Sequence, residues 1–163
     1  MNIFKKTLIE VVVVVSVLVI LVLIMNYFYA DEEITRTIET RLVGQELILE
    51  VADTSYSQSI GLSGRENLGE NEGMLFTYDY EVEGLTFWMK NTLIPLDILF
   101  LSKDGEILHI VENVPICEED PCPTYTYEGS AQYVLELNAG WTEKHDAKEG
   151  DVLEVKVLDQ SDS

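Results

Sequence analysis

Residues 85–105 read LTFWMKNTLIPLDILFLSKDG, and this stretch decides the fold class. Leu85–Met89 and Leu96–Leu101 are rich in apolar and aromatic residues and are separated by a short polar segment, which is the pattern of two β-strands. Asp104-Gly105 is a dipeptide typical of hairpin turns, so a further strand is expected over Glu106–Glu112. The stretch therefore predicts short consecutive strands joined by tight connections.

Similar patterns continue on both sides of this stretch. Strands are also expected at residues 47–51, 74–76, 133–137 and 152–158, and short helices at residues 55–62 and 142–146. Many short strands with few helices predict an α+β domain that is mostly β and mostly antiparallel. We expect a small, partly open, β-barrel-like domain with one or two short helices, preceded by one transmembrane helix.

The N-terminal segment is expected to anchor the chain in a membrane. Leu8–Tyr29 is 22 residues long and largely apolar, and a helix of this length, roughly 33 Å, spans a hydrocarbon core of about 30 Å. Lys5 and Lys6 precede the run and acidic residues follow it, which places the N-terminus in the cytoplasm. A cleaved signal peptide is the alternative, but Phe28 is bulky for the −3 position of its cleavage site. We expect a single-pass protein of the cell membrane with its C-terminal domain outside the cytoplasm.

These features divide the chain into four segments. We expect a membrane anchor at residues 1–30, a polar stalk at residues 31–37, a folded domain at residues 38–158 and a polar tail at residues 159–163. About 130 residues outside the anchor are enough for one small domain with its own apolar core.

Negative charge is concentrated in the part of the chain that follows the anchor. Residues 31–163 hold 8 basic and 29 acidic side chains, a net charge of −21, within a whole-chain net charge of −20. Such a surface repels phosphate backbones, so nucleic acid is excluded as a partner. The acidity indicates either adaptation to high salt, which screens the self-repulsion, or attraction of cationic partners. We favour the first and expect a halophilic protein.

The two cysteines, Cys117 and Cys122, enclose a short acidic loop. Outside the cytoplasm a disulfide is the expected state of such a pair. Zinc binding by the two thiolates and the acidic side chains between them is the alternative, but no histidine lies nearby and the spacing is not Cys-x-x-Cys. We therefore expect a disulfide, no metal site and no cofactor.

An ordered series of motifs runs through the predicted domain: GLSGR at residues 61–65, EGMLF at 72–76, FWMKNTLIPLDI at 87–98, YVLELNAG at 133–140 and GD at 150–151. Together they resemble the DUF192 family, a group of mostly exported prokaryotic domains, from about residue 42 to residue 158. The resemblance implies a small β-rich fold with short helices and brings no established function. This chain departs from the family pattern at Ser63, where the family has methionine, which affects a packing contact there.

A candidate ligand site lies on the strand at residues 85–91. Alternation places Trp88 and Lys90 on one face, and if residues 91–95 form a hairpin loop, Lys90 lies close to Asp97. An indole platform beside directional polar groups suits a small-molecule or glycan ligand. The candidate ligand-binding residues are Arg65, Trp88, Lys90, Asn91 and Asp97, with the Arg65 guanidinium as a fork for a carboxylate or phosphate. The alternative is that Lys90 and Asp97 form a structural ion pair, with Trp88 in the core and Asn91 in a turn.

The sequence assigns no catalytic residue. His109 and His145 each stand alone, and no serine occupies a nucleophile elbow. Asp97 and Glu136 are the carboxyl groups to consider for acid–base work, because both lie among apolar strand residues where burial would raise a pKa.

We therefore expect a membrane-anchored extracytoplasmic domain that acts as a non-enzymatic ligand-binding or envelope-accessory module. The alternatives are a hydrolase of envelope polymers that uses Asp97 and Glu136, and a structural partner of another membrane complex. Convergence of Trp88, Lys90 and Asp97 on one concave pocket would favour ligand binding. Two carboxyl groups facing each other across a cleft would favour the enzyme.

The net charge predicts that the stability of the domain depends on salt. The melting temperature of the full chain, followed by circular dichroism, should rise as salt is raised from about 0.1 M to about 3 M, because the Debye length falls from ~10 Å at 0.1 M to ~3 Å at 1 M and self-repulsion is screened. A melting temperature that does not change over this range would contradict the expectation of a halophilic protein.

Overall fold

The computed structural model describes residues 12–24 and 36–154 of the chain. The chain divides into two units, Met1–Ile34 and Thr35–Ser163. In the first unit, residues 12–24 are helical. Among the described residues, no helix has both the length and the apolar character needed to cross a membrane. The ends of the predicted anchor, most of the predicted stalk and the predicted tail lie outside the described residues.

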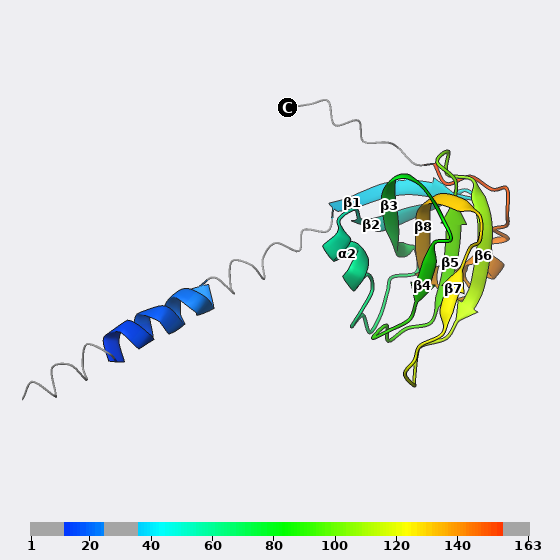
Figure 1. The fold of residues 1–163 in the computed structure, drawn as a ribbon. Helices are drawn as coiled ribbons and strands as arrows, with labels where there is room; N and C mark the ends of the chain where they lie inside the picture. Colours follow the sequence, from blue (N-terminus) through cyan, green and yellow to red (C-terminus); the bar gives the residue numbers. More distant parts are fainter. Residues whose placement is uncertain (1–11, 25–35, 155–163) are drawn as a thin grey trace, which may run out of the picture. The chain divides into compact units, whose positions relative to one another are not determined.

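The second unit is built on an open sheet of six strands. In spatial order these are β1 (Arg36–Leu42), β2 (Gln45–Ala52), β3 (Glu72–Glu83), β8 (Ser130–Asn138), β5 (Leu96–Leu101) and β6 (Ile107–Val114). A second, two-stranded sheet pairs β4 (Thr86–Trp88) with β7 (Thr124–Thr126), and the short helices are α2 (Ser55–Ile60) and α3 (Trp141–His145). Figure 1 shows how these strands and helices are arranged.

The prediction of a mostly β domain with short helices is confirmed, whereas the sheet does not close into a barrel. Its outer strands are β1 and β6. The ladder is antiparallel except between β2 and β3, which run parallel. Because parallel neighbours need a crossover, residues 53–71 carry the chain from β2 back to the start of β3, and α2 lies in that crossover.

Each face of the six-stranded sheet carries its own apolar core. One core combines alternate sheet residues such as Leu99 and Leu135 with Trp141 of α3 and Leu153. The other combines the intervening sheet residues, such as Phe100 and Val134, with apolar residues of β4 and β7. Both faces of the central strands are therefore buried, which explains why β5 reads as a nearly continuous apolar run.

The predicted hairpin between β4 and β5 is wrong. β4 pairs with β7, and both edges of β5 are already occupied, by β6 and by β8. Residues 89–95 therefore form a connection between two sheets, and Lys90 does not lie opposite Asp97 in a ladder.

The α2 helix begins and ends where its sequence favours it. The Thr54 side chain accepts a hydrogen bond from the Ser57 backbone N–H at 3.0 Å, and the Ser57 side chain accepts one from the Thr54 backbone N–H. This reciprocal capping satisfies two backbone donors at the start of the helix. The helix ends at Gly61, whose φ of +51° is a conformation that favours glycine.

Asp97 ties together three segments that are distant in sequence. Its side chain is fully buried. Its Oδ1 accepts hydrogen bonds from the backbone N–H groups of Asn113 and Gly140, at 2.8 and 3.1 Å. Its Oδ2 accepts from the backbone N–H and the hydroxyl of Thr142, at 2.9 and 2.7 Å. One carboxyl group thus joins β5 to the end of β6 and to the start of α3.

Replacing Asp97 by Asn should destabilise the domain by about 2–4 kcal/mol, because the amide NH₂ would face backbone donors and leave them unpaired. The expected fall in melting temperature is about 10 °C. The matched control is the same substitution at the exposed Asp79, which should change the melting temperature little. Equal melting temperatures for the two variants would contradict this role of Asp97.

Candidate pocket around Glu136

A small cavity lies between the sheet, the crossover and the segment that follows β4. Its volume is about 100 Å³. The crossover contributes residues 58–63, and the β4 region contributes residues 87, 88 and 90–92. The sheet contributes Phe76 and Glu136. Three of the predicted ligand-binding residues, Trp88, Lys90 and Asn91, therefore line one cavity together with Glu136.

Glu136 is the buried polar group of this cavity. It lies on β8 directly opposite Met74 on one side and Ile98 on the other, and only 4% of its surface is exposed. Burial raises the pKa of the Glu136 carboxyl to about 8, so the group is mostly protonated at neutral pH. Within the described part of the chain, no hydrogen bond is formed by this carboxyl group. Its donor and acceptor are therefore free for a molecule in the cavity.

Tyr78 is the titratable neighbour of Glu136 on β3. Burial, and then the charge of the Glu136 carboxyl group, raise the pKa of the Tyr78 phenol. The phenol therefore stays protonated at neutral pH and adds no charge near the cavity.

The β4 strand presents a polar and aromatic edge at the mouth of the cavity. The predicted alternation of this strand is confirmed: Trp88 is 54% exposed and Lys90 is exposed, whereas Met89 between them is buried. The Lys90 ammonium stands 5.4 Å from the centre of the Trp88 ring, which is cation–π geometry. Trp88 is thus an exposed platform rather than a core residue.

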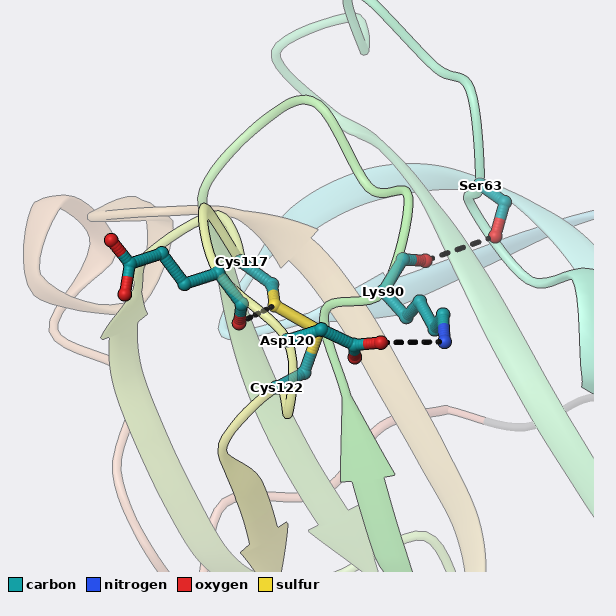
Figure 2. The surroundings of a disulfide bond; sticks show 6 residues. Ser63, Lys90, Cys117, Asp120 and Cys122 are labelled. Carbon is teal, nitrogen blue, oxygen red and sulfur yellow. Dashed lines mark hydrogen bonds and ion pairs between the residues drawn. A yellow bond between two sulfur atoms is a disulfide. The ribbon is translucent and has the colours of Figure 1, made fainter.

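Two hydrogen bonds join the walls of the cavity. The Ser63 hydroxyl donates to the backbone carbonyl of Lys90 at 3.3 Å, as Figure 2 shows, and the Gly64 backbone N–H donates to the carbonyl of Asn91 at 2.8 Å. Asn91 has a φ of +61°, which asparagine tolerates better than most residues. The turn at Asn91 therefore brings the chain after β4 against the crossover.

The disulfide between Cys117 and Cys122 is present, as predicted. Its loop places Asp120 beside Lys90, with 3.7 Å between the carboxylate oxygen and the ammonium nitrogen (Figure 2). The ion-pair partner of Lys90 is therefore Asp120, and the predicted neighbour Asp97 is bound elsewhere.

Arg65 and Asp97 do not line the cavity. The Arg65 guanidinium forms an ion pair with Glu50 of β2 at 2.5 Å, so it is bound to an internal carboxylate. Asp97 and Glu136 occupy neighbouring rungs of the β5–β8 ladder, opposite Leu137 and Ile98 respectively. Because consecutive residues of a strand point to opposite faces, these two carboxyl groups cannot face each other across one cleft.

The wall formed by α2 was not predicted from the sequence. Gln58, Ser59 and Ser63 line the cavity, and the Gln58 amide also donates to the Thr77 carbonyl at 2.8 Å. The signal available in the sequence was a serine-rich segment between Thr54 and Gly64, interrupted by Gly61. It marks a short helix and a turn, but it does not show which face of the sheet the helix covers.

A larger groove of about 540 Å³ lies along β1, β2 and residues 69–72. Its carboxylates are partly paired, since Glu46 binds Arg41 and Glu70 binds Lys144. The buried Thr40 hydroxyl in this groove already donates to the Glu154 carbonyl. None of the predicted site residues lines it, so the smaller cavity is the better candidate.

The two histidines lie apart from the cavity. His109 is 3.1 Å from the Glu149 carboxylate, and the His145 ring packs against Trp141 with ring centres 4.5 Å apart. In the described part of the chain, no group of three or more histidine, cysteine or acidic side chains could hold a metal ion.

The fold and its cavity define a small mixed β domain of a class whose function is uncharacterised. Residues 34–155 match the family DUF192, described as Uncharacterized ACR, COG1430, and the chain belongs to this family. The resemblance seen in the sequence motifs is therefore confirmed.

Two solved structures are similar to this chain. One is a protein of Sinorhizobium meliloti 1021 described as a "putative transcription regulator", with 33% identity, a TM-score of 0.68, and coverage of 74% of this chain and 94% of that chain. The other is a protein of unknown function from Novosphingobium aromaticivorans DSM 12444, with 33% identity, a TM-score of 0.64, and coverage of 72% and 84%. No curated protein matches the sequence.

The raised pKa of Glu136 predicts a specific pH dependence of stability. Between its ordinary pKa of 4.5 and about 8, the folded chain holds a proton at this residue that the unfolded chain has lost. The contribution of Glu136 to stability is therefore complete below this range and falls as pH rises through it, by at most about 1.4 kcal/mol per pH unit.

Replacing Glu136 by Gln should remove this slope, so the variant should be as stable as the parent chain near pH 4.5 and more stable above pH 8. Urea unfolding at a series of pH values measures the difference. Gln at the exposed Glu81 is the control and should keep the parent slope. Parallel curves for the parent chain and the Glu136→Gln variant would contradict the assignment.

Proposed function

We propose that this protein is a membrane-anchored extracytoplasmic module that binds, without catalysis, an uncharged hydroxyl-bearing small molecule or sugar unit in the cavity around Glu136. The observation that carries the proposal is the Glu136 carboxyl group, which is buried, mostly protonated and without a hydrogen-bond partner in the described part of the chain. A buried polar group is stabilised by a hydrogen bond, and a ligand hydroxyl would supply one to Glu136.

The size of the cavity fits one polar unit. At about 100 Å³ it is well below the ~300–1,000 Å³ of pockets that enclose drug-sized ligands. A ligand would insert a few polar atoms toward Glu136 and rest its remaining apolar surface on the exposed Trp88 ring. This arrangement suits the edge of a saccharide ring.

The electrostatics favour an uncharged ligand. The folded domain lies in a part of the chain with a net charge of −21, which disfavours anions. The protonated Glu136 adds no charge at neutral pH, and the Lys90 ammonium is compensated by Asp120. The residues at the cavity therefore offer hydrogen bonds and an aromatic surface without a strong net charge.

The hydrolase alternative has less support. A pair of carboxyl groups acting on one bond must lie on the same side of the protein, and Asp97 and Glu136 are on opposite faces of the sheet. All four donors around Asp97 also hold its oxygens in place.

The location outside the cytoplasm rests on the sequence and on one structural feature. Leu8–Tyr29 has the length and polarity of an anchor, and the disulfide fits an oxidising compartment. Direct DNA binding, which the description of one relative suggests, is disfavoured by the net charge of −21.

A panel of monosaccharides, oligosaccharides and polyols, titrated into the full chain in a zwitterionic detergent without a sugar head group, tests the proposal by saturation-transfer NMR. Replacing Glu136 by Leu should weaken the binding of any ligand found by about ten-fold or more, because a hydrogen bond to a desolvated group is lost. Replacing Lys90 by Ala should also weaken binding, by a smaller factor, because the Lys90 ammonium is exposed to solvent. Lys103→Ala in the β5–β6 turn is the matched control. Binding that is unchanged in both cavity variants would exclude this site.

A further inference from the structure

The ion pair between Lys90 and Asp120 involves two exposed side chains. The side chains of Lys90 and Asp120 are 42% and 75% exposed, and the charged atoms are 3.7 Å apart. Isolated pairs of this kind contribute little, because holding two mobile side chains together costs conformational entropy. Such a pair contributes more where its partners are held in place by other means.

The disulfide supplies this restraint on the Asp120 side. It joins Cys117 to Cys122, with 5.5 Å between their Cα atoms, and encloses Asp120 in a covalent ring of six residues. Pro121 restricts the backbone inside this ring, and Pro123 restricts the chain directly after it. Figure 2 shows Asp120 projecting from this loop toward Lys90.

The restraint on the Lys90 side comes from the wall of the cavity. The Lys90 carbonyl accepts the Ser63 hydroxyl, and the Asn91 carbonyl accepts the Gly64 N–H. The Lys90 side chain also lies over the Trp88 ring. The backbones of both partners are thus restrained by contacts other than their mutual attraction, and the Lys90 side chain also by the Trp88 ring, which lowers the entropic cost of the pair.

We propose that Asp120, held by the disulfide loop, is a specificity-determining residue that compensates the charge of Lys90 and so makes the cavity select uncharged ligands over anionic ones. Asp120 does not line the cavity, so it acts as a positioning and charge-compensating residue and not as a ligand contact. The part that concerns ligands rests on the proposed function, whereas the charge at the cavity mouth can be measured without a ligand.

Quenching of tryptophan fluorescence measures that charge. Trp88 is 54% exposed and Trp141 is 3% exposed, so quenchers in solution report mainly on the ring beside Lys90. Iodide is an anionic quencher and acrylamide an uncharged one. The ratio of their Stern–Volmer constants therefore reports the local potential at Trp88 and cancels changes in exposure.

Asp120→Asn in the full chain should raise this iodide-to-acrylamide ratio, by up to about two-fold near 0.1 M salt and by less at higher salt, because Lys90 then attracts the anion without compensation. The double variant Cys117→Ser/Cys122→Ser should raise the ratio in the same direction, because the loop that presents Asp120 is released. Asp120→Glu keeps the negative charge, so its ratio should lie between those of the parent chain and the Asp120→Asn variant. Lys90→Gln should lower the ratio. All samples are compared at the lowest salt at which circular dichroism shows a folded chain.

The proposal would be overturned if Asp120→Asn left the iodide-to-acrylamide ratio unchanged in a chain that circular dichroism shows to be folded.

In a second arm, the affinities of glucose and glucuronate are compared, and Asp120→Asn should shift the preference toward the carboxylate by a similar factor. If the parent chain binds neither sugar while the quenching ratio responds as expected, the proposed sugar ligand fails and the charge compensation by Asp120 stands. If glucose binds and the preference does not shift, the specificity role of Asp120 fails and the proposed function stands.

Discussion

The fold depends on one buried carboxyl group, that of Asp97. It accepts four hydrogen bonds from two segments that do not share a ladder with each other, the end of β6 and the start of α3. Backbone donors in such connections are costly when they are buried without an acceptor. A single carboxyl group in the inner strand β5 therefore allows the chain to turn sharply at Gly140 while keeping one core beneath it.

Glu136, on the same pair of strands, is in the opposite situation because its carboxyl group has no hydrogen-bond partner in the described part of the chain. It lies one rung away from Asp97 on the other face, among apolar residues, and no donor in the described part of the chain compensates it. One carboxyl group is thus fully bonded by the protein, and the other is left with unused hydrogen-bonding capacity. This contrast separates a group that stabilises the fold from a group that is available to a ligand.

The sequence predicted the elements whose patterns are local, and it failed where a partner is distant. The apolar run of β5 and the short helix α2 were predicted, and so was the position of Glu136 among apolar neighbours. β1 begins at Arg36, inside the predicted stalk. The start of this strand was assigned to the stalk because its alternating charged residues resemble an exposed segment. The donors to Asp97 lie 16 to 45 residues away, so no local pattern could indicate them. The ion pair of Lys90 was assigned to Asp97 because β4 was assumed to pair with β5.

The parallel pairing of β2 and β3 has a consequence for how this architecture can diversify. The crossover between them supplies one wall of the cavity, while the floor and the opposite wall belong to β8 and to the chain after β4. A connection of this kind tolerates changes of length better than the strands that it joins. Insertions or deletions within residues 53–71 would therefore reshape the cavity while leaving the six-stranded sheet and its Asp97 network unchanged. The volume and lining of the cavity can therefore change without any change in the strand order of the sheet.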